Sequence, residues 1–437
     1  MMSTFQNIFK VPDLKKKMLF TLFAIAVYRL GGHIPLPGIN VQALGLLMQQ
    51  LKQQGSIFGM YDIFVGGALS RSAILFLGVM PYISASIIFQ LIGSVFPQIE
   101  RLQRDQAGRR KITQYTRYLT VALAIFQSTG IAIFLETQKF ASATGTMTIV
   151  YDPGWTFRLT AMLSLTCGAI FAMWLGEQIT EKGIGNGISF LIFIGCLEEY
   201  PTYFLRTAQL VITQGLSLIN LILVIIIMIF IVAGVIVMTQ AQRRIPVQYP
   251  KRIVGRRMYG GQSTFLPLRV NTAGVIPIIF AQSLVVFPGT VAAYLPALKN
   301  IAEIFKPGFW GYDLLFFTLI VFFTFFYTSI VFNPVEMADN MKRYGGFIPG
   351  IRPGARTANY IDGVLSKITV PGALFLASIA LVPWYLINFL NVPFYFGGTT
   401  LLIIVGVALD TLQQIESQLM MYHYEGFMKR GKIRGRR

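Results

Sequence analysis

Charged residues are scarce in this chain, and their scarcity indicates its class. Only 13% of the 437 residues are Asp, Glu, Lys or Arg, whereas hydrophobic types make up 54% and the mean hydropathy is +0.61. A soluble domain carries about 25% charged residues, so this chain cannot cover a water-exposed surface in the ordinary way. The composition excludes a soluble enzyme, a disordered chain and a disulfide scaffold.

Residues that carry metal, redox and acid–base chemistry are also rare. The two cysteines, Cys167 and Cys196, each lie in an apolar run and are predicted to be buried. Two isolated histidines, His33 and His423, cannot build a metal site. The chain has no phosphate-binding glycine loop, no H-E-x-x-H zinc pair and no G-x-S-x-G nucleophile elbow. The usual enzyme signatures are therefore absent, and the sequence predicts no cofactor and no metal.

Apolar runs long enough to cross a bilayer are abundant instead. There are ten: 18–34, 73–96, 117–135, 155–177, 184–204, 216–239, 270–295, 312–333, 368–388 and 398–418. Several contain polar residues or prolines, which a span tolerates where it faces protein or water. The pattern predicts an all-α membrane protein with ten transmembrane helices.

Lys and Arg outnumber Asp and Glu by 37 to 18 and are unevenly distributed. On the ten-span topology, 29 of the 37 fall on the side that holds both termini and 6 on the opposite side. Basic residues collect on the cytoplasmic side of membrane proteins, so both termini are predicted to be cytoplasmic. Five spans per half would invert the second half relative to the first, as in an inverted repeat.

The predicted organisation has four parts. They are a cytoplasmic N-terminus (1–17), an N-terminal half (18–204), a C-terminal half with cytoplasmic loops 240–269 and 334–367 (205–418), and a basic cytoplasmic tail (419–437). The glycine-rich segment 61–72 is too short to span and favours a re-entrant or plugging element. The arginines of the two loops suit either anionic lipids or a large acidic partner.

Ionisable residues inside spans would indicate an ion or proton path, and few are evident. Arg29 lies in the first span, and no centred carboxylate is apparent, which disfavours an ion-coupled transporter. A ring of aliphatic side chains is another way to gate a pore. Two pairs spaced by four lie on one helix face each, Val79 with Ile83 and Ile188 with Ile192. Such pairs are common in any span, so channel, secondary transporter and membrane enzyme all remain open on these grounds.

Seven segments resemble the SecY family, the central subunits of the bacterial protein-translocation channel. They are GGALSRSAILFLGVMPYISASIIFQL (66–91), GRRKITQYTRY (108–118), EKGIGNGIS (181–189), RRIPVQYPKR (243–252), LPLRVNTAGVIPIIFAQSL (266–284), GGFIPGIRPGARTANYID (345–362) and QQIESQLMMYHYEGFMKR (413–430). The resemblance implies two pseudo-symmetric inverted five-helix halves. It also implies a passive channel for unfolded secretory polypeptides that releases hydrophobic segments sideways into the bilayer.

The resemblance also assigns roles to particular residues. The pore ring would be Val79, Ile83, Ile188, Ile192, Ile279 and Ile403. The plug, 61–71, would include Ile63, Phe64, Gly66, Gly67, Leu69, Ser70 and Arg71. The lateral gate would include Ser84, Gln90, Asn186, Ser283, Phe287 and Pro288. Docking of SecA or the ribosome would use Arg243, Arg244, Arg252, Arg256, Arg257, Arg352 and Arg356.

The implied partners follow from the same resemblance. They are the small subunits SecE and SecG, the ATPase SecA, the ribosome, signal peptides, nascent chains and anionic lipids, with no small-molecule substrate. The implied location is the bacterial inner membrane. Segment 137–154 and the extreme C-terminus match the family least, so no role is assigned to them.

Overall fold

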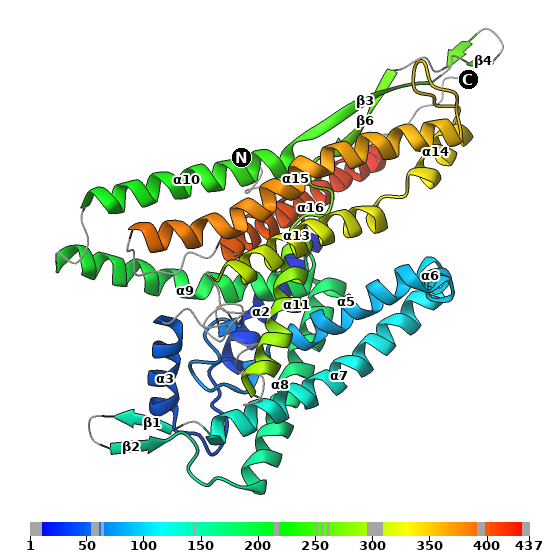
Figure 1. The fold of residues 1–437 in the computed structure, drawn as a ribbon. Coiled ribbons are helices and arrows are strands. Elements are labelled where there is room, and N and C mark those ends of the chain that lie inside the picture. Colours follow the sequence, from blue (N-terminus) through cyan, green and yellow to red (C-terminus); the bar gives the residue numbers. More distant parts are fainter. Residues whose placement is uncertain are drawn as a thin grey trace. The chain divides into compact units, whose positions relative to one another are not determined.

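The structure is a computed structural model dominated by long helices (Figure 1). It describes residues 11–53, 61–62, 65–137, 139–142, 145–213, 218–249, 252–254, 257–259, 263–294, 309–390 and 398–430. Of the predicted site residues, Ile63, Phe64 and Arg256 lie outside the described residues. Arg252, Arg257, Phe287 and Pro288 are described by their backbone alone.

A helix lies at each of the ten predicted spans. In chain order they are α2 (Pro12–Gly31), α5 (Met80–Val95) preceded by the 3₁₀ turn η1 (Ile74–Leu77), α7 (Gln106–Thr137), α8 (Trp155–Lys182), α9 (Gly187–Ile212), α10 (Leu218–Gln240), α11 (Ile276–Tyr294), α13 (Trp310–Val331), α15 (Ala355–Leu390) and α16 (Gly398–Arg430). Within the described ranges, 7 helices are long and apolar enough to cross a membrane, and Ile276–Val286 is a shorter apolar helix. The architecture is that of an all-α membrane protein.

Several helices extend beyond the apolar runs that predict them. α7 begins at Gln106 rather than near 117, and α15 begins at Ala355 rather than near 368. The added turns of α7 hold exposed Arg109, Arg110 and Lys111. Hydropathy marks where a helix enters the apolar layer, but backbone hydrogen bonding continues a helix into water. The spans therefore underestimate helix length at their charged ends.

Short helices and strands occupy the connections. The short helices are α3 (Val41–Gln53), α6 (Pro97–Arg104) and α14 (Pro334–Arg343). Three antiparallel pairs of strands are β1 (Lys139–Ser142) with β2 (Gly145–Thr148), β3 (Gln242–Gln248) with β6 (Ser263–Arg269), and β4 (Arg252–Val254) with β5 (Arg257–Tyr259). None of these strands is predicted by the apolar runs of the sequence.

The chain divides into two compact units. Unit 1 comprises Met1–Gln209, Ser283–Tyr312 and Val407–Arg437, and unit 2 comprises Leu210–Gln282 and Asp313–Gly406. Unit 1 thus takes in the first five spans together with two segments of the predicted C-terminal half.

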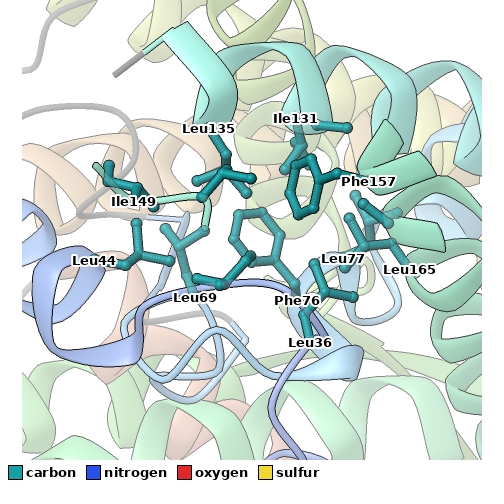
Figure 2. Close-up of a cluster of buried hydrophobic side chains, with 14 of the residues drawn as sticks. Leu36, Leu44, Leu69, Phe76, Leu77, Ile131, Leu135, Ile149, Phe157 and Leu165 are labelled. Atoms are coloured by element: carbon teal, nitrogen blue, oxygen red, sulfur yellow. The ribbon is translucent and has the colours of Figure 1, made fainter. Parts of the chain in front are cut away.

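The core of unit 1 gathers apolar side chains from segments far apart in the sequence. Leu44 of α3, Leu69 and Phe76 meet Leu135 of α7 and Leu165 of α8 (Figure 2). Gly168 permits this packing, because a Cβ there would lie 2.2 Å from the carbonyl oxygen of Ile74. The segment between α3 and α5 is therefore part of the core and not a peripheral loop.

The core of unit 2 joins the two long basic loops. Ile245 and Leu268 of the β3–β6 hairpin pack with Met341 of α14, Ile348 and Ile361 of α15. Backbone hydrogen bonds also link Gln248 and Phe347, at 2.9 and 3.0 Å between nitrogen and oxygen. The described parts of the two loops predicted as separate segments, 240–269 and 334–367, form one structure, the basic platform.

Candidate functional site

Two of the predicted ring residues lie at the start of α5. The amide of Ile83 donates to the carbonyl of Val79 at 3.1 Å, so both side chains lie on one helix face, one turn apart. Val79 is 5% exposed and Ile83 4% exposed. Val65, which precedes Gly66 and Gly67, lies against Gly78. A Cβ at Gly78 would be 3.2 Å from a methyl group of Val65.

Two further ring residues lie in the first turns of α9. The side-chain oxygen of Asn186 accepts from the amides of Ile188 at 3.1 Å and Ser189 at 3.3 Å, which makes Asn186 the N-cap of the helix. Gly187 donates to the Thr180 hydroxyl at 2.8 Å and brings α9 close to α8. This cap fixes where α9 begins. In the first turns of α9, Ile192 is buried and Ile188 is half-buried.

The remaining two ring residues belong to unit 2. Ile279 lies in the first turn of α11, and its amide donates to the carbonyl of Val275 at 3.3 Å. Ile403 lies in α16. Both side chains are buried, with Ile279 5% and Ile403 0% exposed. None of the six predicted ring side chains is exposed on the surface of the protein.

The predicted plug is tied to its surroundings at several points. The Tyr61 hydroxyl donates to the carbonyl of Leu77 at 2.9 Å, and Asp62, fully buried, accepts from the Ser70 amide at 3.0 Å and from its hydroxyl. Leu69 is fully buried within the core of unit 1. The chain turns at Gly66 and Gly67, whose φ angles of 69° and 70° suit glycine.

Arg71 of this segment points to a charged cluster. Its guanidinium pairs with Glu198 of α9 at 2.5 Å, and Glu198 also pairs with Arg29 of α2. Glu198 is not among the predicted site residues, although a glutamate within the apolar run 184–204 is a detectable signal in the sequence. Pairing with two arginines explains how that carboxylate is tolerated there.

The predicted gate residues whose side chains are described make three different kinds of contact. The hydroxyls of Ser84 on α5 and Ser283 on α11 lie 3.0 Å apart, which brings two of them together. Gln90 instead donates to Ser86 of its own helix at 3.1 Å, and Asn186 caps α9. Gln282, which the sequence analysis did not assign, is 1% exposed, and its amide atoms have no hydrogen-bond partner within the described residues.

The predicted docking arginines lie on the basic platform wherever their side chains are described. Arg243 and Arg244 are exposed on β3, while Ile245 and Val247 of the same strand are buried. Arg352 and Arg356 are exposed just before and within the first turn of α15. The Thr357 hydroxyl donates to the Arg352 carbonyl at 3.0 Å and fixes that turn. These four guanidinium groups are therefore presented to solvent on a packed base.

Within the described residues, no group of three or more His, Cys, Asp or Glu residues lies close enough to hold a metal ion. Cys196 is buried as predicted, but Cys167 is exposed on α8, so the prediction that it is buried was wrong. An apolar run alone does not say which helix face points to lipid.

A family model decides between the alternatives that the residues left open. The model that matches, over residues 73–412, is that of SecY. The chain belongs to the SecY family. A relative from Aquifex aeolicus (strain VF5), a protein translocase subunit SecY, is 45% identical over 427 residues, covering 97% of this chain and 98% of the relative. Because the match to the SecY family covers nearly the whole chain, it identifies the chain as a protein-translocation channel.

Solved structures show the same SecY-family fold. A protein conducting channel is similar with a TM-score of 0.64 at 18% identity, covering 92% of each chain. Sec61 in the canine ribosome–channel complex from the endoplasmic reticulum is similar with a TM-score of 0.60 at 17% identity, again over 92% of each. The chain is thus a multi-pass membrane protein with the fold of these channels.

Proposed function

We propose that translocating polypeptides pass through a ring formed by the six aliphatic side chains Val79, Ile83, Ile188, Ile192, Ile279 and Ile403. The observation that carries this proposal is their burial: five are at most 5% exposed, and Ile188 is half-buried. Aliphatic side chains offer a polar chain no hydrogen bonds, so such a ring selects little by sequence. It excludes water and ions when closed because a narrow apolar constriction dewets.

Segment 61–71 acts as the plug of this channel, and the side exit lies where Ser84 and Ser283 meet. A hydrophobic signal segment leaves sideways because the bilayer is a better solvent for its apolar surface than water is. The Ser84–Ser283 hydrogen bond is weak enough to break during that step, since a neutral pair contributes about 0.5–1.5 kcal/mol.

The basic platform docks the partners that supply direction. Arg243, Arg244, Arg352 and Arg356 are exposed on a packed base, and arginine pairs with carboxylates and phosphates in a bidentate way. The ribosome and SecA are the partners we assign to this surface, and SecE and SecG are the small subunits of the complex. The channel itself catalyses no chemical step.

The orientation follows from charge. The platform, the N-terminus and the tail carry most of the Lys and Arg residues, and these collect on the cytoplasmic side. We place the protein in a bacterial inner membrane with both termini in the cytoplasm. The predicted boundaries of the two halves, 18–204 and 205–418, are kept as a proposal for the two repeats.

Replacement of ring residues by asparagine tests the ring. Ile83→Asn and Ile192→Asn place an amide in the constriction, which should raise resting ion conductance and export of substrates with weakened signals. Matched controls are Ile88→Asn on α5 and Leu197→Asn on α9, because both residues are exposed. Equal conductance in ring and control variants would count against the ring.

A further inference from the structure

One carboxylate connects the plug segment to two membrane helices. Glu198 of α9 pairs with Arg71, at 2.5 Å between Oε1 and Nη2, and with Arg29 of α2. Arg71 also donates to the carbonyl of Gly66, and Arg29 to the carbonyl of Ile194. All these residues belong to unit 1.

The three charged side chains are only partly accessible to water. Their exposed fractions are 25% for Arg29, 33% for Arg71 and 21% for Glu198. Partly buried pairs are screened less by water and salt than surface pairs. Glu198 also separates two guanidinium groups of like charge, so its removal leaves a repulsion as well as a lost attraction.

The plug segment is held in different ways at its tip, the turn at Gly66 and Gly67, and at its base, the residues 72–74 that follow it. At the base, backbone hydrogen bonds join Leu36 to Ser72 at 2.7 Å and Ile74 to Ile34 at 2.9 Å. At the tip, the charged contacts are made by side chains, and the turn passes through Gly66 and Gly67. The tip can therefore be released while the backbone pairing at the base persists.

We propose that Glu198, with Arg29 and Arg71, is a specificity-determining latch that sets how hydrophobic a signal sequence must be to open the channel. The proposal rests on the plug role of segment 61–71. A signal of greater apolar surface gains more free energy on leaving water and can open a latched channel. A weaker signal opens the channel only where the latch is weakened.

A purely structural ion pair would behave differently. Its loss would lower the amount of folded channel and reduce export of every substrate alike. Loss of a latch changes a ratio, namely export of a substrate with a shortened signal core relative to export of the same substrate with an intact signal. This ratio is independent of how much channel the membrane contains.

Two variants each remove one charge of the latch. Glu198→Gln keeps the side-chain size, whereas Arg71→Gln shortens the side chain. In Glu198→Gln and Arg71→Gln, we expect the export ratio to rise by at least about tenfold, the lower end of the effect of losing one charged hydrogen bond. The matched control is Glu136→Gln, whose carboxylate pairs with Arg158 at 2.6 Å between α7 and α8 and not with a residue of the plug segment. The control should leave the ratio unchanged. Should Glu198→Gln fail to accumulate in the membrane, Arg71→Gln and Arg29→Gln give the answer.

Deletion of residues 65–71 separates failure of the latch from failure of the plug. If the deletion leaves the resting ion conductance at the wild-type level, the plug role is overturned and the latch with it. If the deletion raises conductance but Glu198→Gln and Arg71→Gln keep the wild-type export ratio, only the latch is overturned. If both act, Glu198→Gln should add nothing to the deletion, because the tip it holds is gone.

Discussion

Two glycine-rich segments of this protein carry arginines, and they use them in opposite ways. In the plug segment, Arg71 is directed inward and pairs with Glu198 on a neighbouring helix. In the basic platform, Arg243, Arg244 and Arg352 are exposed. An inward guanidinium contributes to holding its own chain, whereas an outward one leaves its charge for a partner. Composition alone cannot distinguish these uses.

What orders each segment also differs. The platform is built on an apolar cluster of Ile245, Leu268, Met341, Ile348 and Ile361. The tip of the plug adds charged contacts to an anchor of backbone bonds and buried Leu69. A packed base suits the docking role that we propose for the platform, while a few side-chain contacts suit the movement that we propose for the plug.

The largest effect is expected from the apolar base of the platform. Ile361→Ala removes a fully buried side chain and should destabilise the packing by about 2–5 kcal/mol. Proteolysis of loop 240–269 in membrane vesicles should accelerate, and SecA-driven export should fall. Val370→Ala on the same helix, at a residue 45% exposed, is the control. If proteolysis is equal in the two variants, the platform is not held by this cluster.

Reversing one outward charge should have the next largest effect. Arg352→Glu should lower ATP-dependent, SecA-driven transport into vesicles about tenfold, equivalent to about 1.4 kcal/mol. The proteolysis pattern should stay that of the wild type, because Arg352 is exposed and its backbone contact to Thr357 persists. Normal transport would remove Arg352 from the docking surface.

A neutral contact should matter less than a charged one. Ser84→Ala removes the hydroxyl pair with Ser283 and should shift gate opening by about 0.5–1.5 kcal/mol. Export of a weak-signal substrate should rise by less than it does in Glu198→Gln. The control is Ser94→Ala on the same helix, whose hydroxyl bonds only to the carbonyl of Leu91 among the contacts described. A larger effect than that of Glu198→Gln would reverse the ranking.

The smallest effect is expected from neutralising one platform arginine. Arg243→Gln should change stability by less than about 0.5 kcal/mol. Binding of the platform to an anionic partner should weaken about twofold at low salt. At about 1 M salt, where the screening length is about 3 Å, the difference should vanish. A difference that persists at high salt would mean that Arg243 makes a buried contact.

The sequence predicts the helices of this protein well, but it predicts poorly which segments contact one another. Apolar runs are a property of single segments, so each of the ten coincides with a helix. The latch requires Arg29, Arg71 and Glu198 from three elements, and no local pattern reports their meeting. The same is true of the bond between Gln248 and Phe347, which joins two loops about a hundred residues apart. Asn186 illustrates a third case, because its position before α9 gives it a capping role that its assignment to the gate did not include.

The central claim, that a polypeptide passes between the six aliphatic side chains, is tested most directly by crosslinking. In a chain whose Cys167 and Cys196 are replaced by Ser, Ile279→Cys is crosslinked to a secretory polypeptide stalled during export. The account predicts strong crosslinks from Ile279→Cys and none from Phe230→Cys on α10, where the side chain is 74% exposed. Equal crosslinking at both positions, or crosslinks from Phe230→Cys alone, would contradict it.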